Sequence, residues 1–305
     1  MHDHHTRDEI INAVRAAGIV GAGGAGFPAY IKLQPPKATV IETVIANGSE
    51  CEPLLHTDKT LMRTKANLVV DGMRLAMHAV GAKEGVIGIK RHYADVVKAV
   101  SAALPKDGSI RVHQLENYYP AGDEFLLVYD IKKRIIPEGG LPLHVGVVVN
   151  NVLTLAQMAE AMNGKSVCER IVTVTGAVEV PVVVTAPVGT SYRDLIAAAC
   201  GVVCDHPVVI DGGPMMGQIV HDLDAGISKT TSGIVVLPEG HFVVEMKKIS
   251  VPQMVKKSKA ACCQCFRCSD LCPRNLLGHE IYPHKTMRTI DYNYAEPAKH
   301  ITSAF

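Results

Sequence analysis

The chain contains no tryptophan, and aromatic residues make up only 5% of its 305 residues. Neither positive nor negative charge is in excess, because the chain has 31 lysines and arginines and 30 aspartates and glutamates. Proteins that bind nucleic acid usually carry a positive field, and single-strand binders stack bases on aromatic rings. The composition therefore argues against a nucleic-acid partner.

Long hydrophobic runs are also missing. Apolar stretches such as residues 146–149 and 180–184 are far shorter than the roughly 20 residues that a membrane-spanning helix needs. The first seven residues are polar and rich in histidine, unlike a secretory signal peptide. The four cysteines outside the C-terminal region show no spacing typical of a disulfide framework. We therefore expect no integral membrane segment and a reducing, cytoplasmic location.

A run of cysteines near the C-terminus is the most informative feature that is present. Cys262, Cys265, Cys268 and Cys272 follow the spacing C-x2-C-x2-C-x3-C-P, which ends at Pro273. Bacterial ferredoxins have this spacing, with three thiolates on one 4Fe-4S cluster and the fourth on the other cluster of the pair. Zinc is the competing interpretation, but zinc sites usually use two separated pairs of cysteine or histidine. The dense run favours iron and sulfur.

The number of cysteines does not complete a two-cluster arrangement. No cysteine follows Cys272, although such an arrangement needs three more, and Cys263 between two ligand positions is interpreted as a bystander thiol. Either one cluster takes all four thiolates or the chain continues. The sequence ends in an apolar stub at residues 301–305, whereas intact domains more often end in a solvated terminus. We expect that the chain is incomplete at its C-terminus.

Alternating strand and helix patterns before the cysteine run predict an α/β fold. Ile10, Ile11 and Val14 have helical spacing, and Thr6 is a suitable N-cap for that helix. Because strands and helices alternate, we expect a sheet covered by helices. The predicted strands lie at residues 39–46, 84–89, 109–115 and 145–149, and the predicted helices between them at residues 58–80, 94–104 and, after the last strand, 152–161.

The sequence becomes richer in β-branched residues after about residue 166. Predicted strands at residues 170–176, 180–185 and 207–210 accompany one predicted helix at 192–199, an order typical of a small β-grasp domain. The predicted division is an α/β domain at residues 1–165, a β-grasp domain at residues 166–248 and a helical ferredoxin-type segment at residues 249–305.

A glycine-rich loop follows the first predicted helix. Residues 21–28 read GAGGAGFP, which formally matches the dinucleotide motif G-x-G-x-x-G. In a Rossmann unit that motif follows a strand and opens a helix, whereas here a helix precedes it and Pro28 ends it, so that interpretation fails on context. Consecutive glycines still let backbone N–H groups approach a phosphate or a flat ring. A flexible turn is the plainer alternative.

Three further polar segments adjoin predicted strands and helices. They read NGSECEP at residues 47–53, YPAGDE at residues 119–124 and NN at residues 150–151. Open α/β folds bind ligands at the carboxyl ends of their strands, so these segments are candidates for a binding site. Ordinary turns and helix N-caps are the alternatives.

Taken together, these motifs resemble one family arrangement. GAGGAGFP followed by Lys32, then NGSECEP, YxxGDE, VVNNVLT and the cysteine run occur in the right order over essentially the whole chain. The chain is similar to the flavin-and-NADH subunit lineage of respiratory complex I. Within that lineage it resembles the RnfC subunits of Rnf electron-transport complexes and the cobalamin reductases (PduS) of propanediol-utilisation microcompartments. The middle domain is similar to the soluble-ligand-binding β-grasp (SLBB) domain of that lineage.

The resemblance implies FMN, NADH and a 4Fe-4S cluster as cofactors. Lys32 would offset phosphate or reduced-flavin charge, and the asparagine amides would bind the isoalloxazine edge or the ribityl hydroxyls. The positions implied for FMN are Gly21, Gly23, Gly24, Gly26, Lys32, Asn47, Ser49, Glu50, Tyr119, Gly122, Asp123, Asn150, Asn151 and Thr154. Those implied for NADH are Phe27, Glu52 and Glu124, and those for metal are Cys262, Cys265, Cys268 and Cys272.

The implied activity is that of an NADH-dependent flavin and iron–sulfur oxidoreductase. It would pass electrons to a corrinoid or a partner redox protein, in the cytoplasm and within a bacterial microcompartment. Ser49 and Asp123 depart from complex I-type chains, which have a carboxylate and a glutamate there, and this weakens the NADH prediction more than the FMN prediction. Two alternatives stay open: a non-enzymatic relay or scaffold subunit, and the RnfC subunit of an Rnf-type electron-transport complex.

Overall fold

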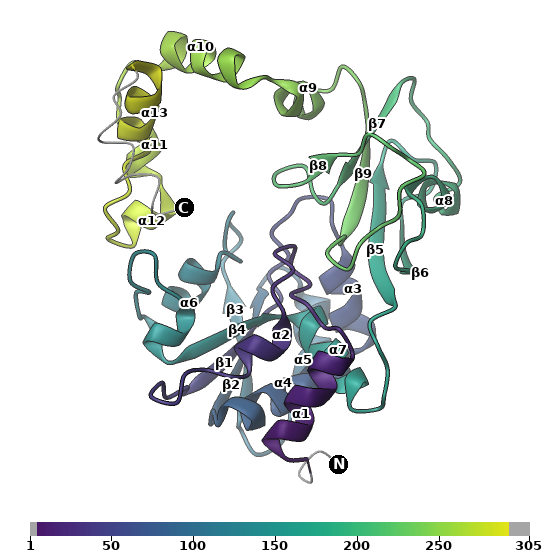
Figure 1. Ribbon diagram of the computed structural model, residues 1–305, viewed down its shortest axis with the longest axis vertical. Helices are drawn as coiled ribbons and strands as arrows, with labels where there is room; N and C mark the ends of the chain where they lie inside the picture. Colours follow the sequence, from purple (N-terminus) through teal and green to yellow (C-terminus); the bar gives the residue numbers. More distant parts are fainter. Residues whose placement is uncertain (1–4, 293–305) are drawn as a thin grey trace.

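The computed structural model describes residues 5–292, which form two sheet domains and a helical arm (Figure 1). The first sheet is parallel throughout, in the order β3-β2-β1-β4. Parallel strands need crossover connections, which the helices between them supply. The strands are β1 (Thr43–Asn47), β2 (Glu84–Lys90), β3 (Ile110–Leu115) and β4 (Val147–Asn151).

Helices cover both faces of this sheet, as the strand–helix alternation predicted. Gly72 lets two of them cross closely, because a Cβ atom there would collide with the backbone carbonyl of Leu155. One face packs against α1 (Arg7–Ala16), α4 (Ala66–Val80), α5 (Ala94–Ala103) and α7 (Val152–Ala161), and the other against α6 (Glu124–Lys132). The shorter elements of this domain are α2 (Ala29–Lys32), α3 (Thr57–Thr64) and η1 (Pro142–Val145).

The observed starts and ends of the helices agree with the sequence-based predictions at one helix and differ at another. The predicted cap of α1 is confirmed, since Thr6 Oγ1 accepts from the N–H of Glu9 while the Glu9 carboxylate accepts from the N–H of Thr6. The single helix expected over residues 58–80 is wrong, because Lys65 has a φ of −134° and separates α3 from α4. A tertiary contact accompanies this break: Thr57, at the start of α3, donates to the carbonyl of Ser232 at 2.6 Å.

The second sheet is mixed, in the order β6-β5-β9-β7-β8. Its helix α8 (Tyr192–Ala198) contributes Leu195 to the core of this domain. The sequence patterns missed the central strand β9, although its buried Ile-Val-Val-Leu run is bounded by glycine and proline. The strands are β5 (Glu169–Gly176), β6 (Val182–Pro187), β7 (Pro207–Asp211), β8 (Gln218–Ile219) and β9 (Gly233–Pro238).

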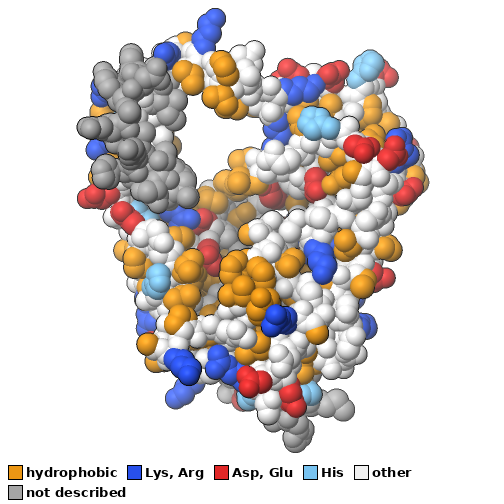
Figure 2. Space-filling view, in the orientation of Figure 1, with side chains coloured by type: hydrophobic (Ala, Val, Ile, Leu, Met, Phe, Trp, Pro, Cys, Tyr) orange, Lys and Arg blue, Asp and Glu red, His pale blue; other side chains and the backbone are white. Residues whose placement is uncertain are grey.

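The C-terminal arm leaves the second sheet and returns to the first domain near α6 (Figure 1). Between its two attachments, an open space lies between the arm and the two sheet domains (Figure 2). Within residues 5–292 no helix is long and apolar enough to cross a membrane. The predicted apolar stub at residues 301–305 lies outside the described residues. The arm consists of α9 (Phe242–Lys248), α10 (Val251–Ala261), α11 (Arg267–Asp270), α12 (Pro273–Leu276) and α13 (Pro283–Tyr292).

Candidate functional site

A cavity of about 430 Å³ lies at the carboxyl ends of β1 and β4. Its walls come from the glycine loop, the segment between β1 and α3, the turn before α6 and the second sheet domain. This is the position at which open α/β folds bind ligands. The predicted cofactor residues that line it are Gly23, Asn47, Ser49, Glu50, Glu52, Tyr119, Gly122, Asp123 and Asn151.

The remaining predicted cofactor residues are not part of the cavity lining. Lys32 Nζ donates to the carbonyl of Val149 at 2.9 Å and lies 3.6 Å from a carboxylate oxygen of Glu124. Two residues with predicted cofactor roles are therefore paired with each other. The residues outside the lining are Gly21, Gly24, Gly26, Phe27, Lys32, Glu124, Asn150 and Thr154.

The glycine loop is a tight turn with free backbone donors at its tip. Gly21 N–H donates to the carbonyl of Phe27 at 2.8 Å, and Ala22 N–H donates to Thr154 Oγ1 at 2.9 Å. Gly24 has a φ of 107°, in the region that favours glycine. The N–H groups of residues 23–25 have no partner among residues 5–292. Successive free amides of this kind suit an anionic ligand.

Three asparagines stand at the ends of β1 and β4. Asn47 and Asn151 are register partners, and their Nδ2 groups donate to Gly122 O at 2.8 Å and Asp58 Oδ2 at 2.7 Å. Asn150 differs, because it is buried and its Nδ2 has no partner in the described part of the chain. An unpaired buried donor costs about 1–3 kcal/mol, so Asn150 is the asparagine with an unused donor for a ligand.

Two acidic side chains are buried beside the cavity. Glu50 accepts the N–H groups of Asp58 at 3.0 Å and Lys59 at 3.1 Å, and Lys59 Nζ lies 3.8 Å from its carboxylate. Burial, followed by repulsion from Asp58, raises the pKa of Glu50 to about 7. Burial also raises the pKa of Asp58 to about 6. The pair therefore changes protonation close to neutral pH.

The second sheet domain is bonded to the cavity wall. Glu52, predicted to bind NADH, accepts the N–H groups of Met215 at 3.0 Å and Met216 at 2.7 Å, so both of its carboxylate oxygens hold a loop of that domain. Arg170 of β5 is buried, and its Nη2 donates to the carbonyl of Ala22 in the glycine loop at 3.3 Å. Both sheet domains thus shape the cavity.

Asp123 links the cavity to the C-terminal arm. Its Oδ1 accepts the N–H groups of Phe125 and Leu126 and caps α6, while its Oδ2 accepts from Arg274 Nη2 at 2.9 Å. The Arg274 guanidinium also lies 3.5 Å from the centre of the Phe125 ring. Because Arg274 follows Cys272 by two residues, this contact holds the end of the cysteine run against the domain that carries the cavity.

The four predicted metal ligands lie on the arm, but the structure does not gather them. Cys262 caps α10, Cys268 lies in α11, and Cys272 caps α12. Within residues 5–292, no three His, Cys, Asp or Glu side chains are placed to hold a metal ion. Thiolates gather through their bonds to the metal, since folding and metal binding are coupled at such sites. Gln264 and Phe266 have left-handed φ angles of 58° and 62°, so the loop between the thiols turns sharply.

Three family profiles match the chain in this order. They describe a Nuo51 FMN-binding domain at residues 14–160, an SLBB domain at residues 171–218 and a 4Fe-4S dicluster domain at residues 261–304. Cobalamin reductase PduS of Salmonella typhimurium is 44% identical over 97% of this chain and 65% of that protein. The Citrobacter freundii cobalamin reductase PduS is 43% identical over 92% of this chain and 61% of that protein.

A third relative comes from a different complex. The RnfC subunit of the Na(+)-translocating ferredoxin:NAD(+) oxidoreductase complex of Acetobacterium woodii is 38% identical over 88% of this chain and 58% of that protein. These profiles and relatives support a PduS/RnfC-like family for the chain. It spans less than two thirds of the length of each of these three relatives.

Solved structures resemble the PduS/RnfC-like chain in fold. Crystal structures of NAD+-reducing NiFe-hydrogenase in the H2-reduced and air-oxidized states align with TM-scores of 0.66 and 0.65. The sequence identities are 22% and 23%. The alignments cover 78% and 77% of the PduS/RnfC-like chain, and 48% and 47% of the hydrogenase chain.

Sequence reasoning missed several residues of the cavity in this PduS/RnfC-like chain. Cys51 lines it, where Cys51 Sγ accepts the N–H of Gly122 at 2.8 Å and lies 3.0 Å from Ser49 Oγ. The signal was present, because Cys51 stands within the NGSECEP segment. The sequence identified Asp58 only as the start of a predicted helix. Met216, from the second sheet domain, carried no local signal because tertiary packing alone brings it to the cavity.

Proposed function

We propose that the chain is the NADH-dependent flavin and iron–sulfur electron-transfer part of a cobalamin-reductase-like oxidoreductase. The contact between Asp123 and Arg274 carries this proposal, because it joins a wall of the cavity to the cysteine run. The FMN-binding and 4Fe-4S profiles support it from sequence. A flavin site and a cluster can exchange electrons only if the protein holds them near each other, and an ion pair between the segment after Cys272 and the cavity wall supports such an arrangement.

The residues at the cavity fit FMN. The free N–H groups of residues 23–25, of which Gly23 lines the cavity, suit its phosphate or its ring; the unpaired amide of Asn150, next to the lining residue Asn151, suits a carbonyl or hydroxyl oxygen. A volume of about 430 Å³ lies within the usual range of small-molecule sites. When bound, FMN would supply the exchange between a two-electron donor such as NADH and one-electron carriers.

Glu50 supplies a proton-binding group beside this site. Its pKa of about 7 lets its carboxyl oxygens hold or release a proton near neutral pH, which is the range that general acid–base work requires. The N–H groups of Asp58 and Lys59 fix the position of the Glu50 carboxyl group. We assign Glu50 the role of holding a proton next to the reacting ligand.

For the cluster, the proposed ligands are Cys262, Cys265 and Cys268, with Cys272 either closing this cluster or serving a second one. Four thiols at these spacings are the donor set of a 4Fe-4S centre. For NADH, the proposed positions are still Phe27, Glu52 and Glu124. Glu52 and Glu124 have protein partners, so NADH would meet both groups already bonded.

The acceptor and location are part of the same proposal. Two relatives are named cobalamin reductase, which supports a corrinoid or a partner redox protein as acceptor. The proposed location is the cytoplasm within a microcompartment, and the proposed division of the chain is at residues 1–165, 166–248 and 249–305.

The identity of 38% to the Acetobacterium woodii protein favours an Rnf-type subunit as second candidate, which co-purification with membrane subunits would support.

Anaerobic reconstitution with iron, sulfide and FMN tests the proposal. Bound flavin and iron are quantified first, and the visible spectrum is then followed during NADH addition. We expect flavin absorbance to bleach and cluster absorbance to fall after it. If flavin is bound and NADH bleaches nothing, the oxidoreductase proposal fails, and reduction by a partner protein alone would identify a relay.

A further inference from the structure

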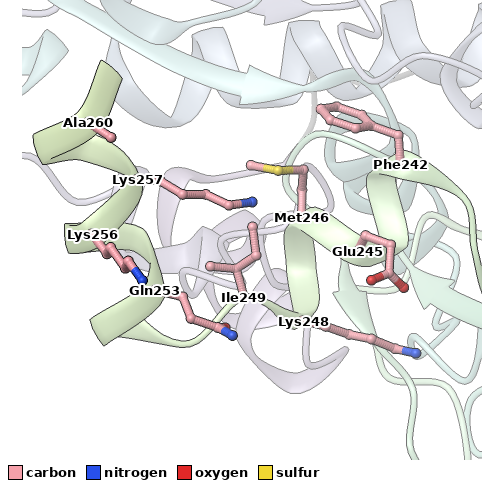
Figure 3. Close-up of a pocket in the computed structure, with 9 residues that line it drawn as sticks. All are labelled: Phe242, Glu245, Met246, Lys248, Ile249, Gln253, Lys256, Lys257 and Ala260. Carbon is pink, nitrogen blue, oxygen red and sulfur yellow. The ribbon is translucent and has the colours of Figure 1, made fainter. Parts of the chain in front are cut away.

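A second hollow lies between α9 and α10, where the arm leaves the second sheet domain. This groove has a volume of about 660 Å³. Figure 3 shows Phe242, Met246 and Ile249 on its α9 side and Lys256 and Lys257 on α10, with the Lys257 side chain directed toward the α9 side. The α9 side therefore carries apolar side chains together with Glu245 and Lys248, and the α10 side is basic.

The apolar side chains here are exposed to an unusual degree. Phe242 is 74% exposed and Met246 is 44% exposed. On α10, Val251 is 70% exposed and Met254 is 49% exposed, and none of the residues of this helix is buried. Single exposed apolar residues are normal, but a contiguous group of them marks a surface that binds another macromolecule.

The charge of the same segment indicates what kind of macromolecule binds. Residues 242–260 contain five lysines and one acidic residue, Glu245, whereas the whole chain has a net charge of only +1. Lys248 is paired with Glu239 at 2.8 Å. Lys256, Lys257 and Lys259 have no ion pair within residues 5–292. These unpaired lysines complement a partner with surface carboxylates.

We infer that the groove between α9 and α10 is the docking surface for an acidic redox protein that would exchange electrons with the 4Fe-4S cluster held by the cysteine run. The inference rests on the proposed function and names the partner of its iron–sulfur segment. α10 ends at Ala261, directly before Cys262, so a protein seated on this helix lies beside the first predicted ligand. Transient redox complexes are small and are steered by opposite charges, which fits an open groove with free lysines.

A matched pair of double variants tests the inference with the reconstituted full chain. The probe is an acidic flavodoxin, and its affinity is measured by titration at low and at moderate salt. In the first variant Lys256→Glu and Lys257→Glu reverse the charge of the groove. In the control Lys98→Glu and Lys106→Glu, on exposed positions outside it, change the net charge equally.

The groove variant is expected to bind flavodoxin at least tenfold more weakly than the unchanged chain does. The affinity of the control should stay within about threefold of the unchanged chain, because like charges cost several kcal/mol only where they face each other in contact. Affinity of the unchanged chain should fall as salt rises. Carbodiimide cross-linking should join flavodoxin to Lys256 or Lys257. Equal weakening in both variants, or no flavodoxin binding at low salt, overturns the inference.

Two further measurements separate this inference from the proposed function. NADH-dependent bleaching of flavin and cluster is recorded for each variant without flavodoxin, and it should be unchanged in both. If bleaching is absent while flavodoxin still binds through the groove, the proposed function fails and the docking surface stands. Sedimentation of the chain alone examines self-association, and a dimer that the groove variant abolishes would overturn the inference by assigning the groove to a second copy.

Discussion

Polar side chains that line the cavity are held by hydrogen bonds to other groups of the protein, whereas two lysines that line the groove between α9 and α10 have no ion-pair partner among the described residues. Both terminal polar atoms of the side chain form hydrogen bonds in Asn47, Asn151 and Asp123. The Glu50 carboxylate is held by two backbone N–H groups. Lys256 and its neighbour Lys257 have no ion pair in the described part of the chain. The first arrangement holds one small ligand in one pose, and the second adapts to a large partner.

The largest expected effect distinguishes the cysteine run from the cavity. Cys268→Ser removes one of the predicted ligands and should abolish most of the iron bound after reconstitution, while bound FMN stays near its original level, because the cavity lies in another domain. Iron and flavin analysis of the same sample measures both.

Cys263→Ser is the matched control, since Cys263 is exposed and stands between ligand positions. It should retain its iron. Loss of iron in both variants would mean that Cys263 is a ligand, and loss of flavin together with iron would show that the two ends are not independent.

The next effect concerns how tightly the cavity wall is packed. In Gly122→Ala the added Cβ would meet Ser49 Oγ and would lie 2.9 Å from Cys51 Sγ. Overpacking of this kind costs about 1–3 kcal/mol, so FMN affinity should fall about ten- to hundredfold. Fluorescence titration of flavin measures this fall.

Gly240→Ala provides the comparison, because its Cβ would have nothing within 4 Å. FMN affinity should not change in this variant. An unchanged affinity in Gly122→Ala would mean that FMN does not depend on this wall.

A smaller effect comes from the buried carboxyl groups. In the folded chain the pKa of Glu50 is raised from 4.5 to about 7, so the folded state binds this proton more tightly than the unfolded chain does. The contribution to the free energy of unfolding is therefore largest below pH 4 and is lost as pH rises toward about 7. Glu50→Gln should remove this fall, about 2 kcal/mol between pH 5 and pH 7.5, in urea unfolding at pH 5, 6 and 7.5.

Asp205→Asn, at an exposed position, serves as the matched control for that series. It should leave the pH dependence of the free energy of unfolding as it is in the unchanged chain. The proposed proton-holding role of Glu50 is untenable if Glu50→Gln shows the same pH dependence as the unchanged chain.

The smallest effect tests the contact between the two regions. Arg274 and Asp123 are about one quarter exposed in their side chains, so their coupling in a double-mutant cycle should be about 1 kcal/mol or less. Arg274→Gln and Asp123→Asn, singly and together, are compared by urea unfolding, with Arg267→Gln as an exposed control. Hydrogen exchange should rise in α6 and α12 of the Arg274→Gln chain. No rise would show that other contacts hold the arm.

Local patterns predicted a sheet covered by helices and the polar segments next to its strands, because these depend on hydrophobic periodicity and on turn residues. The break at Lys65 was not predictable, since it accompanies the contact of Thr57 with Ser232, which lies in the other domain. The two hydrogen bonds that Glu52 accepts from the N–H groups of Met215 and Met216 could not be predicted for the same reason. Local sequence shows that a carboxylate is present, and tertiary packing decides what it binds.

Arg170 determines how the two sheet domains come apart. Its guanidinium is buried between them, where Nε donates to the carbonyl of Thr231 at 3.0 Å and Nη2 to that of Ala22. Pulling the domains apart leaves the Ala22 carbonyl without this donor and weakens the attraction between the guanidinium and Asp58 of the first domain. We therefore expect partial separation to be unfavourable and the two domains to lose their structure together, in one cooperative calorimetric transition that the exposed helix α10 does not share.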